Sequence, residues 1–120
     1  MDIQVTFDGR VWKVAPDPAK VRVGTVVRWL MMGKNCPYPR LRWTVYFHHG
    51  TPFRPWRTCF TVSSEVEMPS DTPSEPEGEH TGIAEAGPVT QQGEYKYAVM
   101  VENPEDGTTL GNDDPRLIVT

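Results

Sequence analysis

The feature that most constrains this chain is a period-2 pattern over residues 93–101, in which one face is apolar and the other carries Glu94 and Lys96, followed by Glu102. Alternate side chains of an extended strand point to opposite faces, so this stretch can present one apolar face to a core. That face holds Tyr95, Tyr97, Val99 and Val101. Gly93 opens the stretch and Asn103-Pro104 closes it, and these residue types suit turns. We therefore expect a central β-strand around which the other strands assemble.

The composition favours a β-rich fold in a single domain. The chain has 120 residues with 12 Pro and 10 Gly, and its β-branched and aromatic residues gather in short alternating segments. A chain of this length supports one core but not two, and the sequence contains no amphipathic helical pattern. We predict one domain over residues 1–120 with an all-β fold, a Greek-key β-sandwich of about seven to nine strands.

Strand patterns recur along the first half. Residues 3–7 and 11–15 flank Asp8-Gly9, a dipeptide that favours a type I′ turn, and so predict a hairpin. Residues 19–29 predict two short strands hinged at Gly24. Their inward set is Val21, Val23, Val27 and Trp29, and their outward set is Lys20, Arg22 and Arg28. Residues 41–47 predict a strand with the apolar face Leu41, Trp43, Val45 and Phe47.

The second half combines short strands with polar connections. Its remaining predicted strands are residues 58–62, 82–86, 108–110 and 116–119. Composition predicts a loop over residues 33–40 and a turn over residues 103–107. Residues 63–82 are rich in Pro, Ser and Glu, so we expect a loosely packed acidic loop that is a candidate for binding a partner.

The order of these segments resembles that of the cupredoxin family. Residues 21–29 resemble the family's valine strand with a Gly-containing bend, and residues 43–47 resemble its next core strand. Residues 93–99 resemble the Gly-x-Tyr-x-Tyr/Phe-x-Cys strand that precedes the copper loop, and residues 114–119 are similar to the last strand. The resemblance implies a cupredoxin-like sandwich.

The same resemblance implies a member without copper ligands. A blue-copper centre takes a His from a middle strand, then a Cys, a His and often a Met from the later loop. The first His position falls on Trp43 and the Cys position on Val99, and neither side chain can ligate copper. Residues 100–107 contain no His. The resemblance therefore implies degenerate copper positions filled by core packing, no cofactor and no electron transfer. Metal-free modules of this kind look like accessory or interaction domains.

A metal-binding or redox protein with a non-standard site is an alternative hypothesis. Its possible ligands are His48, His49, His80 and Cys59. Adjacent residues on an extended segment point apart, so the two neighbouring histidines do not chelate one ion in the usual way. Cys36 and Cys59 have no metal-ligand spacing, and whether they form a disulfide stays open.

No catalytic motif supports an enzyme. A triad of Ser63, His80 and Asp71, or a dyad of Cys59 and His49, can be assembled on paper. Neither has the strained turn or the flanking glycines that present a nucleophile. We expect a protein that is not an enzyme.

Basic and aromatic residues gather between residues 34 and 57. Arginines among aromatic side chains are typical of protein interfaces, and also of anion or single-strand binding. We take as candidate partner-binding residues Lys34, Tyr38, Arg40, Arg54, Trp56 and Arg57. In the alternative interpretation, Phe53 and Trp56 plug the end of the sandwich while the arginines pair with acidic residues of the second half.

Charge is divided between the halves of the chain. Residues 1–60 carry ten Lys or Arg and three Asp or Glu, residues 61–120 carry two and thirteen, and the net charge is -4. The simpler interpretation is that strands of the two halves interleave, so that the charges compensate locally. Overall acidity argues against nucleic acid as the main ligand, although an anion or nucleic-acid binder working through the basic half is a further alternative.

These features together predict a non-catalytic, metal-free cupredoxin-like module that mediates protein–protein interaction as an accessory or adaptor subunit. The longest apolar run, residues 26–32, is too short to span a membrane. The N-terminus begins directly with a strand pattern, so we expect a cytoplasmic protein. The partner and the oligomeric state do not follow from the sequence.

Overall fold

The chain folds entirely from β-strands in the part that the structure describes. The computed structural model describes residues 1–8, 12–36, 39–48, 50–53, 59–65 and 78–120. Within these ranges there are eleven strands and no helix: β1 (Asp2–Phe7), β2 (Trp12–Ala15), β3 (Ala19–Val21), β4 (Val27–Cys36), β5 (Arg40–Tyr46), β6 (Cys59–Glu65), β7 (Gly78–Ala86), β8 (Gly93–Lys96), β9 (Ala98–Asn103), β10 (Thr108–Asp113) and β11 (Arg116–Val119). It follows that the described residues include no helix long and apolar enough to cross a membrane. The predicted all-β sandwich is confirmed.

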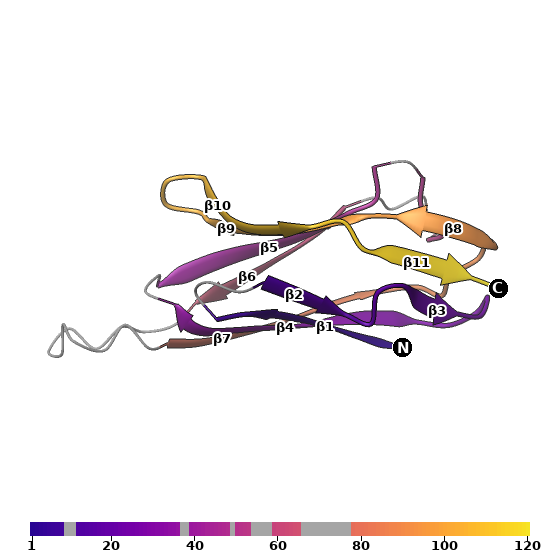
Figure 1. Ribbon diagram of the computed structural model, residues 1–120, viewed down its shortest axis with the longest axis horizontal. Helices are drawn as coiled ribbons and strands as arrows, with labels where there is room; N and C mark the ends of the chain where they lie inside the picture. The colour runs from indigo at the N-terminus through magenta and orange to yellow at the C-terminus, as the bar shows by residue number, and fades with distance from the viewer. Residues whose placement is uncertain (9–11, 37–38, 49, 54–58, 66–77) are drawn as a thin grey trace, which may run out of the picture.

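The first layer is a four-stranded sheet in the order β2-β1-β4-β7, seen along the lower side of Figure 1. β1 and β2 form the predicted antiparallel hairpin, with Phe7 opposite Trp12. The turn itself falls partly on residues 9–11, outside the described residues. β1 also pairs in parallel with β4, and β4 pairs antiparallel with β7. β4 therefore lies inside the sheet and β7 at its edge.

The second layer contains the predicted central strand, which the structure divides in two. One sheet has the order β10-β9-β5-β6 and another the order β3-β11-β8. β8 and β9 are separated by Tyr97 alone, whose backbone N–H donates to the carbonyl of Pro115 at 3.1 Å. At this residue the strand stops pairing with β11 and starts pairing with β5. β9 is an inner strand of its sheet, as a central strand should be.

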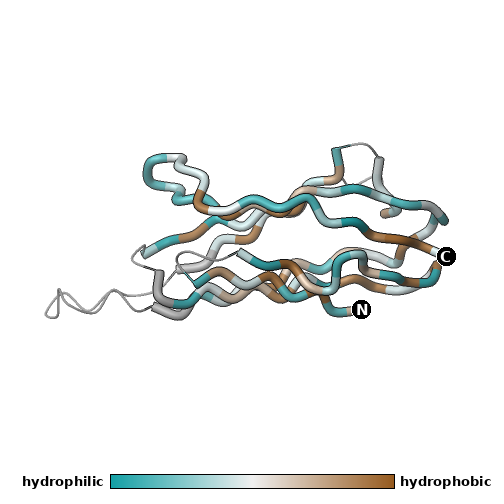
Figure 2. The backbone as a smooth tube through the Cα atoms, viewed as in Figure 1, coloured by the Kyte–Doolittle hydropathy of each residue, from teal (hydrophilic) through white to brown (hydrophobic). Residues whose placement is uncertain are grey.

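The core lies between the layers and follows the alternation of the strands. In β1 every second residue is buried. The predicted apolar face of residues 41–47 is also buried, with Leu41, Trp43 and Val45 in β5 and Phe47 directly after it. Figure 2 shows apolar and polar residues alternating along the strands of both layers. Trp29 of β4 contacts the rings of Phe47, Phe53, Phe60 and Tyr97. This aromatic cluster joins the layers, and it shows that Phe53 belongs to the core.

Three expectations about element bounds are corrected. β4 continues through Cys36, although composition predicts a loop from Gly33, because Gly33 is held in register between Phe7 and His80. β10 continues to Asp113 instead of ending at Leu110, because Asn112 and Asp113 pair with β9. β7 is nine residues long and begins at Gly78, so the predicted loop over residues 63–82 is shortened at both ends. Its residues 66–77 lie outside the described residues.

Two further expectations differ from the structure: which side chains of residues 19–29 point inward, and the number of strands. Val23 is 46% exposed, whereas Val21, Val27 and Trp29 are buried. Thr25 donates its backbone N–H to the carbonyl of Arg22, so Val23 sits in a turn and not on a strand face. The described strands number eleven and not seven to nine, in part because the break at Tyr97 divides one predicted strand.

Candidate protein-interaction face

The positions that the cupredoxin resemblance assigns to copper ligands lie within the packed core. Trp43 of β5 and Val99 of β9 belong to adjacent paired strands, where Trp43 faces Val101 and Val45 faces Val99. Both side chains are completely buried. The indole ring of Trp43 stacks on that of Trp12 at a centroid distance of 6.0 Å. Neither side chain reaches solvent or offers a ligand atom for copper.

The aromatic cluster beside these residues carries one buried hydroxyl. Trp29 Nε1 donates to Tyr97 Oη at 3.4 Å. Burial raises the pKa of the Tyr97 phenol well above its ordinary value. Tyr97 therefore stays protonated at physiological pH, and its polar atom is satisfied inside the core.

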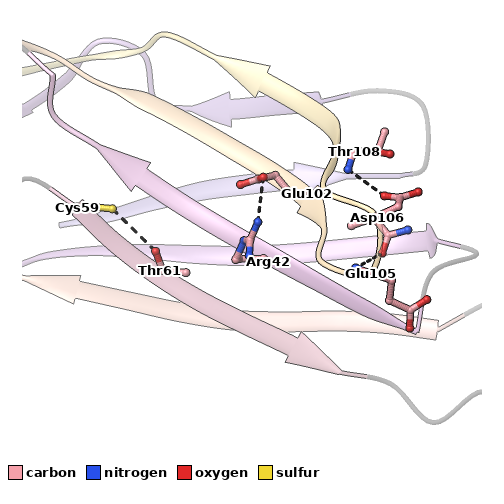
Figure 3. Close-up of polar contacts among 8 residues, drawn as sticks. Arg42, Cys59, Thr61, Glu102, Glu105, Asp106 and Thr108 are labelled. Atoms are coloured by element: carbon pink, nitrogen blue, oxygen red, sulfur yellow. Dashed lines mark hydrogen bonds and ion pairs between the residues drawn. The ribbon is translucent and has the colours of Figure 1, made fainter.

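The histidines and the described cysteine are dispersed over the fold. His80 is fully buried on β7, His48 stacks on Tyr46, and Cys59 is a free, exposed thiol on β6. Cys59 Sγ lies 3.9 Å from Thr61 Oγ1 (Figure 3). His49 lies outside the described residues. In the described part of the chain, no three His, Cys, Asp or Glu side chains come together as metal ligands.

The structure places two of the six candidate partner-binding residues. Lys34 and Arg40 are exposed, near the end of β4 and at the start of β5. Tyr38, Arg54, Trp56 and Arg57 lie outside the described residues. Cys59, which follows the undescribed segment 54–58, pairs with Tyr46, at the opposite end of β5 from Arg40. Cys59 is therefore remote from Arg40, and also from Lys34.

Among the described residues, Arg42, Arg28 and Arg116 each pair with a carboxylate. Arg42 of β5 contacts Glu102 of β9 at 3.1 Å, which joins the basic half of the chain to the acidic half (Figure 3). Arg28 contacts Asp2 at 3.0 Å, and Arg116 contacts Glu94 at 2.8 Å. Because Arg42 comes from the predicted basic region, its pairing agrees with the interpretation in which strands of the two halves interleave.

The outer face of the first layer carries two adjoining hollows that share Thr6 and Met32. We call them together the Met32 groove. The first has a volume of about 300 Å³ and is also lined by Gln4, Leu30, Met31, Thr81, Gly82 and Ile83. The second has a volume of about 250 Å³ and adds Phe7, Asp8, Lys13 and Lys34 to the shared residues.

The register between β4 and β7 brings apolar side chains together on this face. Leu30 of β4 lies opposite Ile83 of β7, and Met32 lies one pleat further along β4. Met32 is 40% exposed and Ile83 is 61% exposed. Large apolar side chains gathered on an exposed sheet face are typical of a binding surface. Lysines at one end of the groove give that end a cationic character.

Sequence reasoning identified Lys34 but missed Met32, Leu30 and Ile83. Residues 29–32 are Trp-Leu-Met-Met, an uninterrupted apolar run. A strand with one face in water should alternate, so such a run indicates that both faces meet apolar surroundings. This signal was present in the sequence, and it indicates that the outer face of β4 is apolar as well as its inner face.

Comparison with models of protein families gives no match, and comparison with curated proteins gives none either. Similar folds are found among solved structures. The CARDB domain of a protein from Pyrococcus furiosus, in complex with di-metal ions, is 17% identical at a TM-score of 0.51, over 98% of this chain and 90% of that chain. Auracyanin B is 14% identical at a TM-score of 0.47, over 99% of this chain and 88% of that chain. Identities this low concern the fold alone.

Proposed function

We propose that this protein is a non-catalytic, metal-free, cupredoxin-like module that binds another protein through the Met32 groove. The observation that carries the proposal is the exposed Met32 at the junction of two hollows, on the same face as Lys34. Methionine adapts its flexible thioether to irregular partner surfaces, which makes it common at binding sites.

The chemistry of the groove indicates the kind of partner. Leu30 and Met32 offer apolar contact, while Lys13 and Lys34 at one end favour a carboxylate. Asp8 lies among the lysines and restricts where that carboxylate can sit. We expect a partner segment that combines an apolar side chain with an acidic residue. We also propose that the protein acts as an adaptor inside the cell.

The first prediction concerns Met32→Glu. The new carboxylate lies in the apolar centre of the groove, so it should weaken partner binding at least about tenfold, equivalent to about 1.4 kcal/mol. Because Met32 is 40% exposed, the melting temperature should stay close to that of the native protein. The partner is first captured with the native protein from its source cells and identified, and its affinity is then measured by titration calorimetry.

Thr109→Glu is the matched control for this experiment. Thr109 is exposed on β10, which belongs to the other layer, so its substitution adds the same charge away from the groove. It should leave the affinity for the partner unchanged. Equal binding by Met32→Glu and the native protein would remove the groove from the proposal.

A further inference from the structure

β7 is an edge strand of the first layer in the described part of the chain, and β6 of the other layer packs against its inner face. It has one hydrogen-bonded neighbour, β4, and within the described residues no other backbone bond is made by residues 81–86. In an antiparallel ladder every second residue of an edge strand turns its N–H and C=O away from its neighbour. Natural edge strands are usually blunted by charged side chains, especially lysine, by proline, by a bulge or by short length. β7 has nine residues without Lys or Pro, its register is regular from His80 to Ala86, and within that regular part Glu85 is the one acidic residue.

The side chains of β7 leave room for another strand to approach. Gly82, Ala84 and Ala86 point inward and are small, whereas Thr81, Ile83 and Glu85 point outward. Ile83 is the most exposed large apolar side chain in the described part of the chain, at 61%. An added strand would cover its side chain and pair the free backbone groups in the same step.

We infer that β7 pairs antiparallel with β7 of a second copy of this chain, on a two-fold axis at Ile83. Such an isologous contact joins the two first layers into one eight-stranded sheet. Ile83 then faces Ile83 of the second copy, and Thr81 faces Glu85, to whose carboxylate its hydroxyl can donate. Leu30, which lies opposite Ile83, extends the apolar row into each copy.

Charge and strand length favour the register centred on Ile83 over the registers centred on Gly82 and on Ala84. Centring the pair on Gly82 would set Glu85 opposite position 79, which is also glutamate, and like charges directly opposite destabilise a sheet. Centring it on Ala84 would set Ile83 against Glu85 and would run past the end of β7 into Gly87, whose φ is +139°. The Ile83-centred register avoids both and uses His80 to Ala86 fully. This self-complementarity favours a second copy over an unrelated strand.

The second prediction is a dimer that Ile83→Lys abolishes. Sedimentation equilibrium of the full chain, from about 10 µM to about 1 mM, should give a mass that rises toward two chains, because a small interface associates in this range. Ile83→Lys places like charges face to face and should give the mass of one chain throughout. Ile83→Val keeps the apolar contact and should still dimerise, as should Thr109→Lys on β10. A native chain that stays monomeric at every concentration would overturn the inference.

Cysteine cross-linking tests the register independently, in a background in which Cys36 and Cys59 are replaced by serine. Under mild oxidation Ile83→Cys should form a disulfide-linked dimer. Thr81→Cys and Glu85→Cys should each stay uncross-linked alone and should cross-link when mixed. Equal cross-linking of all three single variants would show random collision and contradict the register. Met32→Glu should leave the dimer intact, so failure of this inference is distinguishable from failure of the proposed partner site.

Discussion

At the scale of single residues, Trp43 links the sequence prediction to the structure most directly. The alternation of residues 41–47 predicts its inward orientation, and its side chain is completely buried. It stacks on Trp12 of β2, which the sequence assigns to a hairpin without indicating its neighbour. Contact between these rings depends on how the layers pack, and no local pattern encodes that.

The third prediction concerns Asp106 in the turn between β9 and β10. Hydrogen bonds from the Thr108 side chain and backbone lower the pKa of this carboxyl, and the backbone N–H of Thr108 lies 2.9 Å from Asp106 Oδ1 (Figure 3). A lowered folded-state pKa stabilises the fold above the unfolded pKa, and this contribution is lost as pH falls through the folded pKa. Thr108→Ala should raise the pKa of Asp106 toward its ordinary value.

The measurement is a carboxyl-carbon NMR titration of Asp106 in both proteins. Thr109→Ala is the control, because the Thr109 side chain is not a cause of the shift. Superimposable titration curves for the native protein and Thr108→Ala would show that the Thr108 side chain does not lower the pKa of Asp106.

At the scale of elements, periodicity predicts strands well where one face is buried and fails where pairing overrides composition. Leu41, Val45 and Phe47 are buried as the alternation predicts. Gly33 reads as a loop residue but lies within β4, because strands on both sides hold it. Asn112 reads as a turn residue but pairs with Met100. Pairing between distant segments decides these cases, so the local sequence alone predicts them poorly.

The same limit applies to the candidate site. Exposed basic residues such as Lys34 are recognisable from composition. Ile83 is recognisable as part of a strand, but its place at the edge of a sheet depends on the strand order β2-β1-β4-β7. The sequence therefore predicts which residue types are available to the groove, but it does not predict which strands bring them together.

The fourth prediction concerns Gly87, which directly follows β7. A Cβ atom there would meet Val26 Cα at 2.9 Å, and the φ of +139° is one that other residues rarely adopt. Gly87→Ala should lower the free energy of unfolding by more than about 1 kcal/mol, because both the contact and the backbone conformation oppose the methyl group. Denaturation with urea measures this change.

Gly107→Ala provides the comparison. Gly107 also has a positive φ, +75°, but open space surrounds its Cβ position. Only the conformational cost of about 1 kcal/mol remains at this site. An equal loss in the two variants would show that the approach of Val26 does not contribute.

At the scale of the whole molecule, the two halves of the chain are structurally inseparable. β4 of the first half pairs with β7 of the second, and β5 pairs with β9. Thr120 exchanges backbone hydrogen bonds with Val21 and Val23 at the other end of the sequence. The opposite charges of the halves therefore meet within one sandwich, as the pair of Arg42 and Glu102 illustrates.

The fifth prediction follows from this interleaving. A fragment of residues 1–60 lacks β7, which pairs with one side of β4, and β9, which pairs with one side of β5, and it is cut within β6. It should therefore show no cooperative thermal transition and a much weaker β-sheet circular dichroism spectrum than the whole chain. Co-expression with residues 61–120 should restore both signals. A cooperative transition in the isolated fragment would mean that the first half folds alone.

The stacked rings of Trp12 and Trp43 also give the molecule a built-in optical reporter. They come from different layers, with centroids 6.0 Å apart and planes 24° apart. Two indole chromophores this close couple their electronic transitions, and the coupling vanishes once the layers separate. The near-ultraviolet circular dichroism spectrum of the unlabelled protein should therefore report whether the two layers are packed together. The far-ultraviolet spectrum reports the strands separately.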